Sequence, residues 1–451
     1  MGSLRSVWSR SKLFRILLVI AFTIAVLRLA AQVYLSVERM LPGQSETQII
    51  PNDLQDYLDA ATRLAQRLPL YPVTSDYGKY YQYPPVFALV MQPFLALPPG
   101  LDYLLNFILR LAGYALLYFC WGRIFQRARL EKALDCWAWT LPIWLVFSAF
   151  WSDLTYMNIY ILSALFFTLL VDAVMAENLL LSLLWLTVLL QTKPFWAIAA
   201  LLPLLLGRYK FFIRIFLAGL VVNAFLVGAF LLMVGPAYGW QQHVGFIQFL
   251  AALDRNFPWR LAASGFLGYN HSILQVAIFL LGNSSATFRL AVVIKIVLLL
   301  PLVVLCVRSF LHPARRAGYE APELALGLAF ALYLGVYIWL DMVWEVSLGC
   351  AIFVFLLAQF DAQKVTRALL WLVFLPYVLI DLWQIGSYAI LGDSIFLPGG
   401  EYIRTDYSMY IPIVMIVVLV FYGLILVKIG LTNPEAAQTG RLEHHSPTPV
   451  T

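Results

Sequence analysis

The chain has 451 residues, of which 62% are hydrophobic and 12% are charged, and its formal net charge is +6. Soluble domains are roughly 45–50% apolar and about 25% charged. The composition therefore excludes a soluble protein with one buried core and predicts an all-α polytopic membrane protein. The positive charge requires no nucleic-acid partner, because basic residues in a membrane protein report its orientation first.

The chain begins with a basic segment, Arg5 to Arg15, that leads into a long apolar run. No small-residue cleavage site follows closely, so we expect a retained signal-anchor helix. Runs long enough to cross a bilayer are predicted at 14–36, 103–121, 136–150, 157–173, 178–191, 192–206, 211–234, 289–307, 321–340, 343–360, 367–384 and 408–428. Two shorter runs, 84–98 and 271–283, are predicted to be re-entrant or interfacial helices.

Twelve crossings would put both ends of the chain on one side of the membrane. Most of the 30 basic residues fall on that side, so the positive-inside rule predicts cytoplasmic N- and C-termini and a plasma (inner) membrane location. We expect one integral membrane domain, 1–430, followed by a disordered cytoplasmic tail, 431–451. The outer loops 37–83, 235–270 and 385–407 would form the active-site face, because the cytoplasmic loops contain no GxxxxGK[ST] or GxGxxG motif.

The first outer loop carries three carboxylates, Asp53, Asp56 and Asp59, in a segment, 52–66, that we expect to be helical. Acidic residues in a first helical turn suit the helix dipole, which is a purely structural explanation. The functional alternative is that one carboxylate acts as a general base. A carboxyl group beside an apolar surface has a raised pKa and accepts a proton from a hydroxyl nucleophile.

A tyrosine cluster containing Tyr81 and Tyr83 precedes Pro84-Pro85. The two prolines predict an extended entry into the following short helix. Tyrosines at this depth are common as an interfacial belt, and they also stack on sugars or line a groove for a lipid chain. Both interpretations remain open at this stage.

Four later elements are predicted on the same outer face. Lys193 would either extend its amine to the interface or bind a phosphate beside a helix N-terminus. Asn158 begins a predicted span, and Asn270 is either a helix cap or part of a site with the two residues that follow it. Glu345 lies in a short outer turn, where a carboxylate is often only a solvated charge. Convergence on one face predicts a shared site.

The order and spacing of these elements resemble glycosyltransferase family 87, the polyprenyl-phosphate-mannose-dependent α-mannosyltransferases. The residues that carry the resemblance are Asp53, Tyr57, Ala60, Leu70-Tyr71, Tyr83-Pro84-Pro85 through Leu89, Pro93, Asn158, Lys193-Pro194, Asn270-His271-Ser272 and Trp344-Glu345. One departure is that members often carry a histidine after the late Trp-acid pair, where this chain has Val346-Ser347.

The resemblance implies a GT-C-like fold with about 12 membrane helices. It further implies transfer of a hexose, in this family mannose, from a polyprenyl-phosphate sugar to a glycolipid or glycan acceptor outside the cytoplasm. No metal or other cofactor is expected. Asp53 would be the general base, and the substrate-binding residues would be Tyr57, Tyr81, Tyr83, Asn158, Lys193, Asn270, His271, Ser272, Trp344 and Glu345.

Two other classes of function remain open from the sequence. A transporter or lipid flippase would need a midplane site and commonly an internal repeat. The halves show no such repeat, and the ionisable residues within predicted spans are few: Arg28, Arg110 and Lys295. A scaffold for cell-envelope assembly would predict freely replaceable outer-loop carboxylates.

Overall fold

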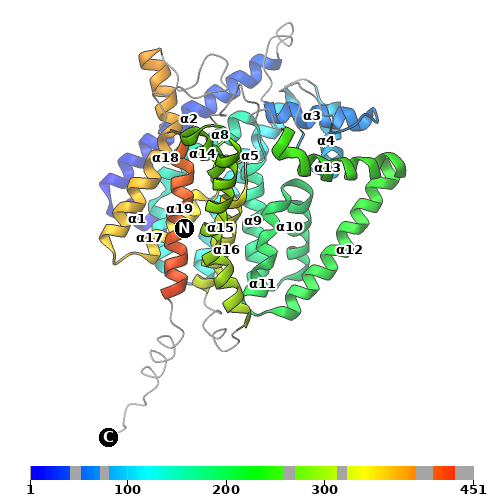
Figure 1. Cartoon of the computed structure of the whole chain (residues 1–451). Helices are drawn as coiled ribbons and strands as arrows, with labels where there is room; N and C mark the ends of the chain where they lie inside the picture. The colour runs from blue at the N-terminus through cyan, green and yellow to red at the C-terminus, as the bar shows by residue number, and fades with distance from the viewer. Residues whose placement is uncertain are drawn as a thin grey trace.

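The computed structural model describes residues 2–40, 52–71, 81–98, 100–256, 270–311, 322–392 and 410–431. Helices joined by short connections make up these ranges, and none of them contains a strand (Figure 1). The predicted all-α class is therefore confirmed. The predicted tail beyond Leu431, and the predicted outer loop beyond Gly392, lie outside the described residues.

Long apolar helices account for most of the predicted membrane spans. Within the described ranges, seven are long and apolar enough to cross a bilayer: α2 (Lys12–Met40), α5 (Leu101–Arg127), α12 (Tyr209–Val234), α15 (Ser285–Leu311), α16 (Pro322–Trp339), α18 (Lys364–Leu391) and α19 (Tyr410–Leu431). An eighth results if α6 (Glu131–Trp139) is joined to α7 (Leu141–Val146) and α8 (Ser148–Tyr156), across a bend of 49°. The chain is thus a multi-pass membrane protein, preceded by the short helix α1 (Gly2–Arg10).

The other four predicted crossings coincide with shorter elements. These are α9 (Tyr160–Met175), α10 (Leu179–Thr192), the pair η2 (Pro194–Leu201) and α11 (Leu202–Leu205), and α17 (Gly349–Gln359). Nearly all side chains of α9 and α17 are buried by other helices. A helix surrounded by protein need not match the thickness of the bilayer by itself. Twelve crossings therefore remain a prediction.

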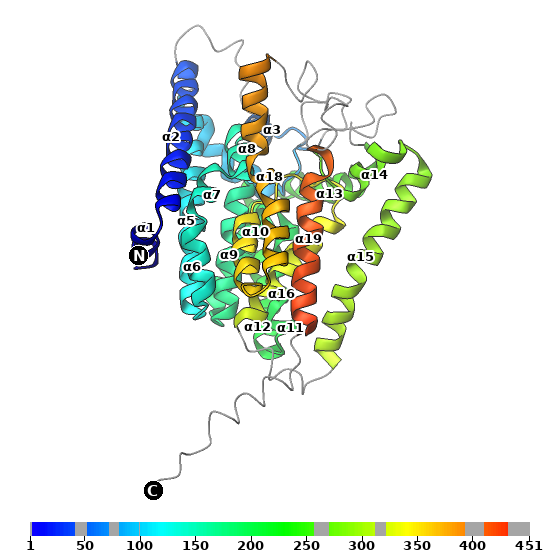
Figure 2. The same cartoon turned by 90° about the vertical axis from the view of Figure 1, so that its left-hand side faces the viewer.

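Burial separates a protein-facing centre from a lipid-facing periphery. In an apolar 18-residue stretch of α16, 72% of the residues are buried by protein. The corresponding fractions are 11% in α2, 17% in α12 and 17% in α15. Figure 2 shows α2 and α15 on opposite sides of the bundle. Exposed leucine, valine and phenylalanine side chains cover these outer helices, as expected of surfaces that contact lipid.

Short elements gather at one end of the bundle, at the top of Figure 1. They are α3 (Asn52–Ala65), α4 (Pro85–Met91), η1 (Gln92–Ala96), α13 (Pro236–Asn256) and α14 (Ile273–Leu281). The predicted helix at 52–66 and the two predicted short helices are therefore present. Within the predicted outer loop 235–270, residues 236–256 are helical, which the sequence interpretation did not include.

α13 turns back across this end of the bundle because of Gly235. Its φ of 96° is accessible to glycine and strained for other residues, and it allows the chain to leave α12 sharply. Two hydrogen bonds then fix α13 to the segment after α3: the Tyr238 hydroxyl donates to Leu68 O (2.7 Å), and Leu70 N donates to Gln242 Oε1 (2.8 Å). The outer elements are thereby held to one another as well as to the bundle.

Candidate active site

Asp53 lies in the first turn of α3 and is part-exposed to a small pocket. The Asn158 Nδ2 group donates a hydrogen bond of 2.9 Å to its Oδ2 atom. Burial raises the pKa of Asp53 to about 6, although the charge of Lys193 and the Asn158 hydrogen bond act in the opposite direction. A carboxylate with this pKa is well placed to accept a proton near neutral pH.

Asn158 is itself fixed in orientation. Its Oδ1 atom accepts a hydrogen bond from Ile159 N (2.7 Å) and lies within hydrogen-bond distance of the Tyr83 hydroxyl (3.4 Å) and the Tyr57 hydroxyl (3.5 Å). The two hydroxyls lie 2.8 Å apart. Each hydroxyl has one proton, so at most one of them donates to Oδ1 while the two are bonded to each other. The donors Ile159 N and one tyrosine hydroxyl identify this atom as the oxygen, and the amide nitrogen therefore points toward Asp53. Three of the predicted substrate-binding residues, Tyr57, Tyr83 and Asn158, thus form one network with the predicted base.

Arg110 supports the turn that carries Asn158. Its side chain is 1% exposed, and it donates to Asn158 O (2.6 Å) and to Met157 O. Asp153 caps α9 by accepting hydrogen bonds from Tyr160 N (2.9 Å) and Ile161 N (3.3 Å). The sequence interpretation does not include Arg110 or Asp153 in the site. The signal was available, because ionisable residues within apolar helices are costly and commonly functional.

Lys193 lies at the junction of α10 and η2, outside the seven candidate spans, and is 9% exposed. Its Nζ atom lies 4.1 Å from the centre of the Tyr160 ring and 4.6 Å from that of Tyr83, which stabilises a cation. Burial lowers the pKa of Lys193 to about 8, and the carboxylates of Asp53 and Asp153 oppose that shift. Lys193 and Asp53 are therefore close enough for the charge of each to shift the pKa of the other.

Glu345 belongs to the connection between α16 and α17. Its Oε2 atom accepts a hydrogen bond of 2.7 Å from the Tyr377 hydroxyl, and its backbone oxygen accepts one of 3.1 Å from Tyr337. Burial raises the pKa of Glu345 to about 7, against the lowering effect of the Tyr377 bond. Glu345 and Trp344 line the same small pocket as Asp53.

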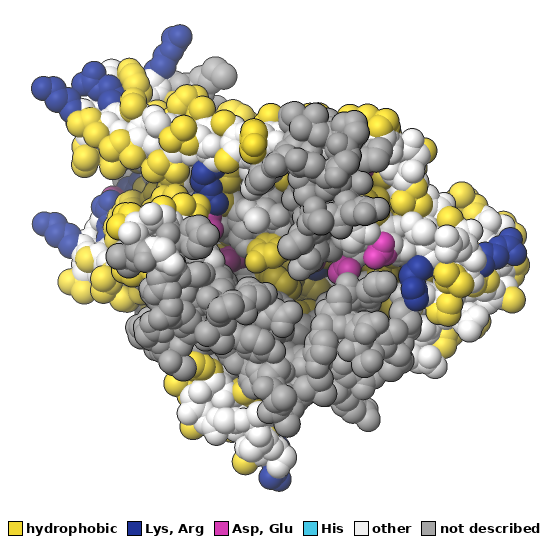
Figure 3. All heavy atoms as spheres, turned by 90° about the horizontal axis from the view of Figure 1, so that it is seen from above, with side chains coloured by type: hydrophobic (Ala, Val, Ile, Leu, Met, Phe, Trp, Pro, Cys, Tyr) yellow, Lys and Arg dark blue, Asp and Glu magenta, His cyan; other side chains and the backbone are white. Residues whose placement is uncertain are grey.

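We call this cavity the acidic pocket. Its empty space, including the part that is open to solvent, is about 260 Å³. The lining residues are Asp53, Ala149, Ser152, Asp153, Tyr156, Asn158, Tyr160, Trp344 and Glu345. Figure 3, which looks onto the end that carries α3, shows acidic side chains recessed beside hydrophobic ones.

A second, larger cavity adjoins the first and contains two lysines. We call it the two-lysine groove. Its empty space, including the part that is open to solvent, is about 1420 Å³. Its lining combines Lys193, Lys295 and Asp341 with apolar residues that include Phe195, Phe246, Leu250 and Val292. Tyr160 lines both cavities, so its ring stands between the acidic pocket and the groove.

Tyr81 lies apart from Asp53. Its side chain is 5% exposed, and its hydroxyl donates to Pro84 O (2.9 Å). Tyr81 lines a third cavity of about 620 Å³ beside α3, together with Asp56 and Asp59. Burial, followed by the charges of Asp53 and Asp59, raises the pKa of Asp56 to about 8. Of the three equivalent carboxylates in the sequence, only Asp53 lines the acidic pocket.

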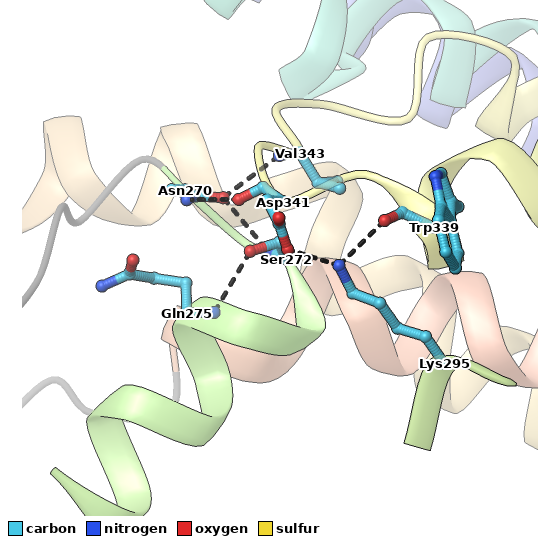
Figure 4. A network of polar contacts seen from close by, with 7 residues as sticks. All are labelled: Asn270, Ser272, Gln275, Lys295, Trp339, Asp341 and Val343. Atoms are coloured by element: carbon cyan, nitrogen blue, oxygen red, sulfur yellow. Dashed lines mark hydrogen bonds and ion pairs between the residues drawn. The ribbon is translucent and has the colours of Figure 1, made fainter. Parts of the chain in front are cut away.

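The Asn270-His271-Ser272 element contacts protein backbone. Asn270 Nδ2 donates to Asp341 O (3.0 Å), and Asn270 Oδ1 accepts from Val343 N (3.1 Å), as Figure 4 shows. Ser272, not Asn270, caps α14, because its Oγ accepts a hydrogen bond from Gln275 N (3.1 Å). The three side chains are at most 1% exposed and line none of the three cavities described above. Their predicted contact with substrate stays a prediction.

A comparison with protein-family models finds glycosyltransferase family 87, matched over residues 81–335. The match covers more than half of the chain. The protein belongs to glycosyltransferase family 87. Searches of curated proteins and of solved structures found no match.

The family 87 match, residues 81–335, includes some of the site residues and excludes others. Tyr83, Asn158, Lys193 and Asn270 fall inside the matched residues, whereas Asp53 and Glu345 fall outside them. Membership therefore establishes glycosyl transfer, and the role of Asp53 depends on its geometry. Among the described residues, no group of three or more His, Cys, Asp or Glu is arranged to hold a metal ion.

Proposed function

We propose that this family 87 protein transfers a hexose, in the first instance mannose, from a polyprenyl-phosphate sugar to a glycolipid or glycan acceptor. The reaction would take place on the extracytoplasmic face of the plasma membrane, with both termini in the cytoplasm. The observation that carries the proposal is the placement of Asp53. Asn158 orients its carboxylate in the acidic pocket, within the electrostatic reach of a buried lysine.

The two cavities support a division of the substrates between them. The acidic pocket suits a sugar hydroxyl, because carboxylate oxygens accept hydrogen bonds from hydroxyl groups. The two-lysine groove combines apolar walls with the charge of Lys193 and suits a lipid chain that ends in a phosphate, whereas Lys295 is paired with Asp341. Lys193 lowers the pKa of Asp53 more than Arg110 does, and it makes no ion pair among the described residues, so its charge is available to an anionic substrate.

The proposed reaction is a single displacement. The carboxylate of Asp53 accepts the proton of the acceptor hydroxyl, and the hydroxyl oxygen forms a bond to the anomeric carbon. The bond between that carbon and the phosphate oxygen breaks, and its electron pair leaves with the lipid phosphate. Lys193 stabilises the negative charge that develops on the leaving phosphate. Attack from the face opposite the phosphate inverts the anomeric centre.

The decisive experiment replaces the proposed base without changing its shape. Asp53→Asn should lower the transfer rate by about 100- to 10,000-fold, the range that a general base contributes. The measurement is sugar transfer from a polyprenyl-phosphate mannose donor by purified protein in proteoliposomes. Asp59→Asn is the matched control, because Asp59 lies on the same helix, bonds to Gln55 and does not line the acidic pocket.

Near-wild-type transfer by Asp53→Asn would remove Asp53 from the role of base. If the wild-type protein transfers sugar only from a nucleotide donor, the proposed donor class is wrong, although family membership is unaffected. Equal losses in the Asp53 and Asp59 variants would indicate that the measurement reports the stability of α3.

A further inference from the structure

The connection between α16 and α17 forms a wall of both cavities. Leu340, Asp341 and Met342 line the two-lysine groove, and Trp344 and Glu345, only two residues further on, line the acidic pocket. We call residues 340–348 the dividing segment. Any displacement of the dividing segment therefore moves the acidic pocket and the groove together.

Lys295 holds one end of the dividing segment from a neighbouring helix. Its Nζ atom donates to Trp339 O (2.8 Å) and forms an ion pair with Asp341 Oδ1 (2.5 Å), as Figure 4 shows. Lys295 is 3% exposed, although it belongs to α15, in which only 17% of the residues in the apolar stretch are buried by protein. A lysine within an apolar helix is expensive, so a specific role for its charge is the expectation.

Neutral groups hold the rest of the dividing segment. The Asn270 side chain bonds to Asp341 O and Val343 N, and His271 N donates to Val343 O (2.8 Å). At the far end, the Tyr377 hydroxyl accepts from Val346 N (2.8 Å) and donates to Glu345. The Lys295–Asp341 pair, by contrast, joins two charged side chains, and it lies on the side of the groove.

We propose that Lys295 is a positioning residue for sugar transfer: by holding Trp339 and Asp341 it fixes the dividing segment and thereby places Trp344 and Glu345 opposite Asp53. The inference rests on the proposed function. Lys295 does not touch the reacting atoms in this account. It acts through the position of Trp344 and Glu345 in the wall of the acidic pocket, which sets the placement of the bound acceptor relative to Asp53.

A purely structural role makes a different prediction. Removing one partner of an ion pair is most destabilising when the other charge is left buried. The side chain of Asp341 is 46% exposed, so water can solvate it when the lysine is removed. We therefore expect Lys295→Met to fold. Its activity then reports positioning, because misplacing a catalytic group by about 1 Å costs about 100-fold in rate.

The test measures kcat and the donor KM for Lys295→Met, Lys295→Arg and Asp341→Asn in proteoliposomes with a polyprenyl-phosphate mannose donor. Lys295→Met should lower kcat by about 10- to 100-fold while the donor KM changes by less than about threefold. Lys295→Arg should recover most of the loss, because it keeps the charge. Asp341→Asn should lower kcat in the same direction. Lys428→Met is the matched control, since Lys428 donates to Gln359 O (3.4 Å) and lines none of the three cavities.

Two results would overturn the inference. Unchanged kcat in Lys295→Met would show that the dividing segment needs no charge, and a raised donor KM with unchanged kcat would make Lys295 a ligand of the donor instead. If Lys295→Met does not fold, Asp341→Asn alone decides between the same outcomes. A wild-type protein that transfers no sugar from any polyprenyl-phosphate donor would refute the proposed function. Active wild-type protein with unaffected variants would refute only the positioning role.

Discussion

The acidic pocket and the two-lysine groove share the ring of Tyr160 as a wall, yet they have opposite chemistry. The pocket, of about 260 Å³, has three carboxyl groups in its lining, Asp53, Asp153 and Glu345. The groove, of about 1420 Å³, is mainly apolar and contains two lysines and one aspartate. Such a difference between adjoining cavities is expected where one substrate is a hydroxyl compound and the other is an anionic lipid.

Separation of charge also has an energetic reason. Two like charges 4 Å apart repel by about 4 kcal/mol at the effective dielectric of a protein surface. A phosphate bound directly among the carboxylates would be opposed by that repulsion. The positive charge of Lys193, which lies over the Tyr160 ring and acts on Asp53, offsets this repulsion between phosphate and carboxylates.

Among the changes that test this contrast between the cavities, removing the cation at their boundary should have the largest effect. Lys193→Met should lower kcat by about 100- to 1,000-fold, comparable to the loss of a group that stabilises a developing oxyanion. Lys193→Arg should retain part of the activity, because it keeps the charge but not the compact ammonium geometry. Steady-state transfer from the polyprenyl-phosphate donor measures both. Full activity in Lys193→Met would contradict the proposal that the groove binds the donor phosphate through Lys193.

Glu345→Gln should have the next largest effect, and it should act on the acceptor. Hydrogen bonds to charged groups contribute about 1.5–3 kcal/mol, so we expect the acceptor KM to rise by about 10- to 100-fold. The donor KM should stay the same, because Glu345 lines only the acidic pocket of the two cavities. Tyr377→Phe is a useful companion, since it removes the donor to Glu345 Oε2 and leaves the carboxylate in place. A rise in the donor KM alone would reverse the assignment of the cavities.

The pH dependence should show one limb from each cavity. Asp53, with a pKa raised to about 6, must be ionised to accept a proton, so kcat/KM should fall about tenfold per pH unit below that value. Lys193, with a pKa lowered to about 8, must be protonated, so activity should also fall above that value. Asn158→Leu removes a hydrogen bond that lowers the pKa of Asp53 and should move the acidic limb upward. A profile that is flat from pH 5 to 9 would contradict both roles.

The smallest effect should come from a change that touches neither cavity. Gly235→Ala forces a residue with a side chain to adopt a φ of 96° with a ψ of 129°, a sparsely populated conformation that costs about 1–3 kcal/mol of stability. We expect a lower midpoint of thermal unfolding with unchanged donor and acceptor KM values. A strong loss of transfer would show that the placement of α13 matters to the groove more than its lining suggests.

The sequence predicted the local features of the site well. The helix at 52–66, the short helices near 84–98 and 271–283, and the all-α membrane class all followed from patterns within one segment. The choice of Asp53 over Asp56 and Asp59 came from the resemblance to family 87, in which Tyr57 and Ala60 follow Asp53 at the family's spacing. Of these three carboxylates, only Asp53 lines the acidic pocket in the structure.

Features that depend on distant segments were not predictable in the same way. Nothing near residue 270 indicates that Asn270 bonds to the backbone of Asp341 and Val343, because the partners lie about 70 residues away in the chain. The same holds for Arg110, whose partners are carbonyl groups at Met157 and Asn158. Hydropathy also overlooked α13, since its aromatic and polar residues resemble those of an outer loop.

The network around Asp53 has a consequence for the synthesis of the protein. Asp53 is made early, whereas its partners Asn158 and Lys193 and the opposing Glu345 emerge much later. Helix α3 therefore cannot make these contacts until most of the later helices have been synthesised and inserted. Since chains fold largely in the order of their synthesis, the active site should be among the last parts of this protein to assemble. A nascent chain that stops before Trp344 would contain Asp53 but lack part of the lining of the acidic pocket.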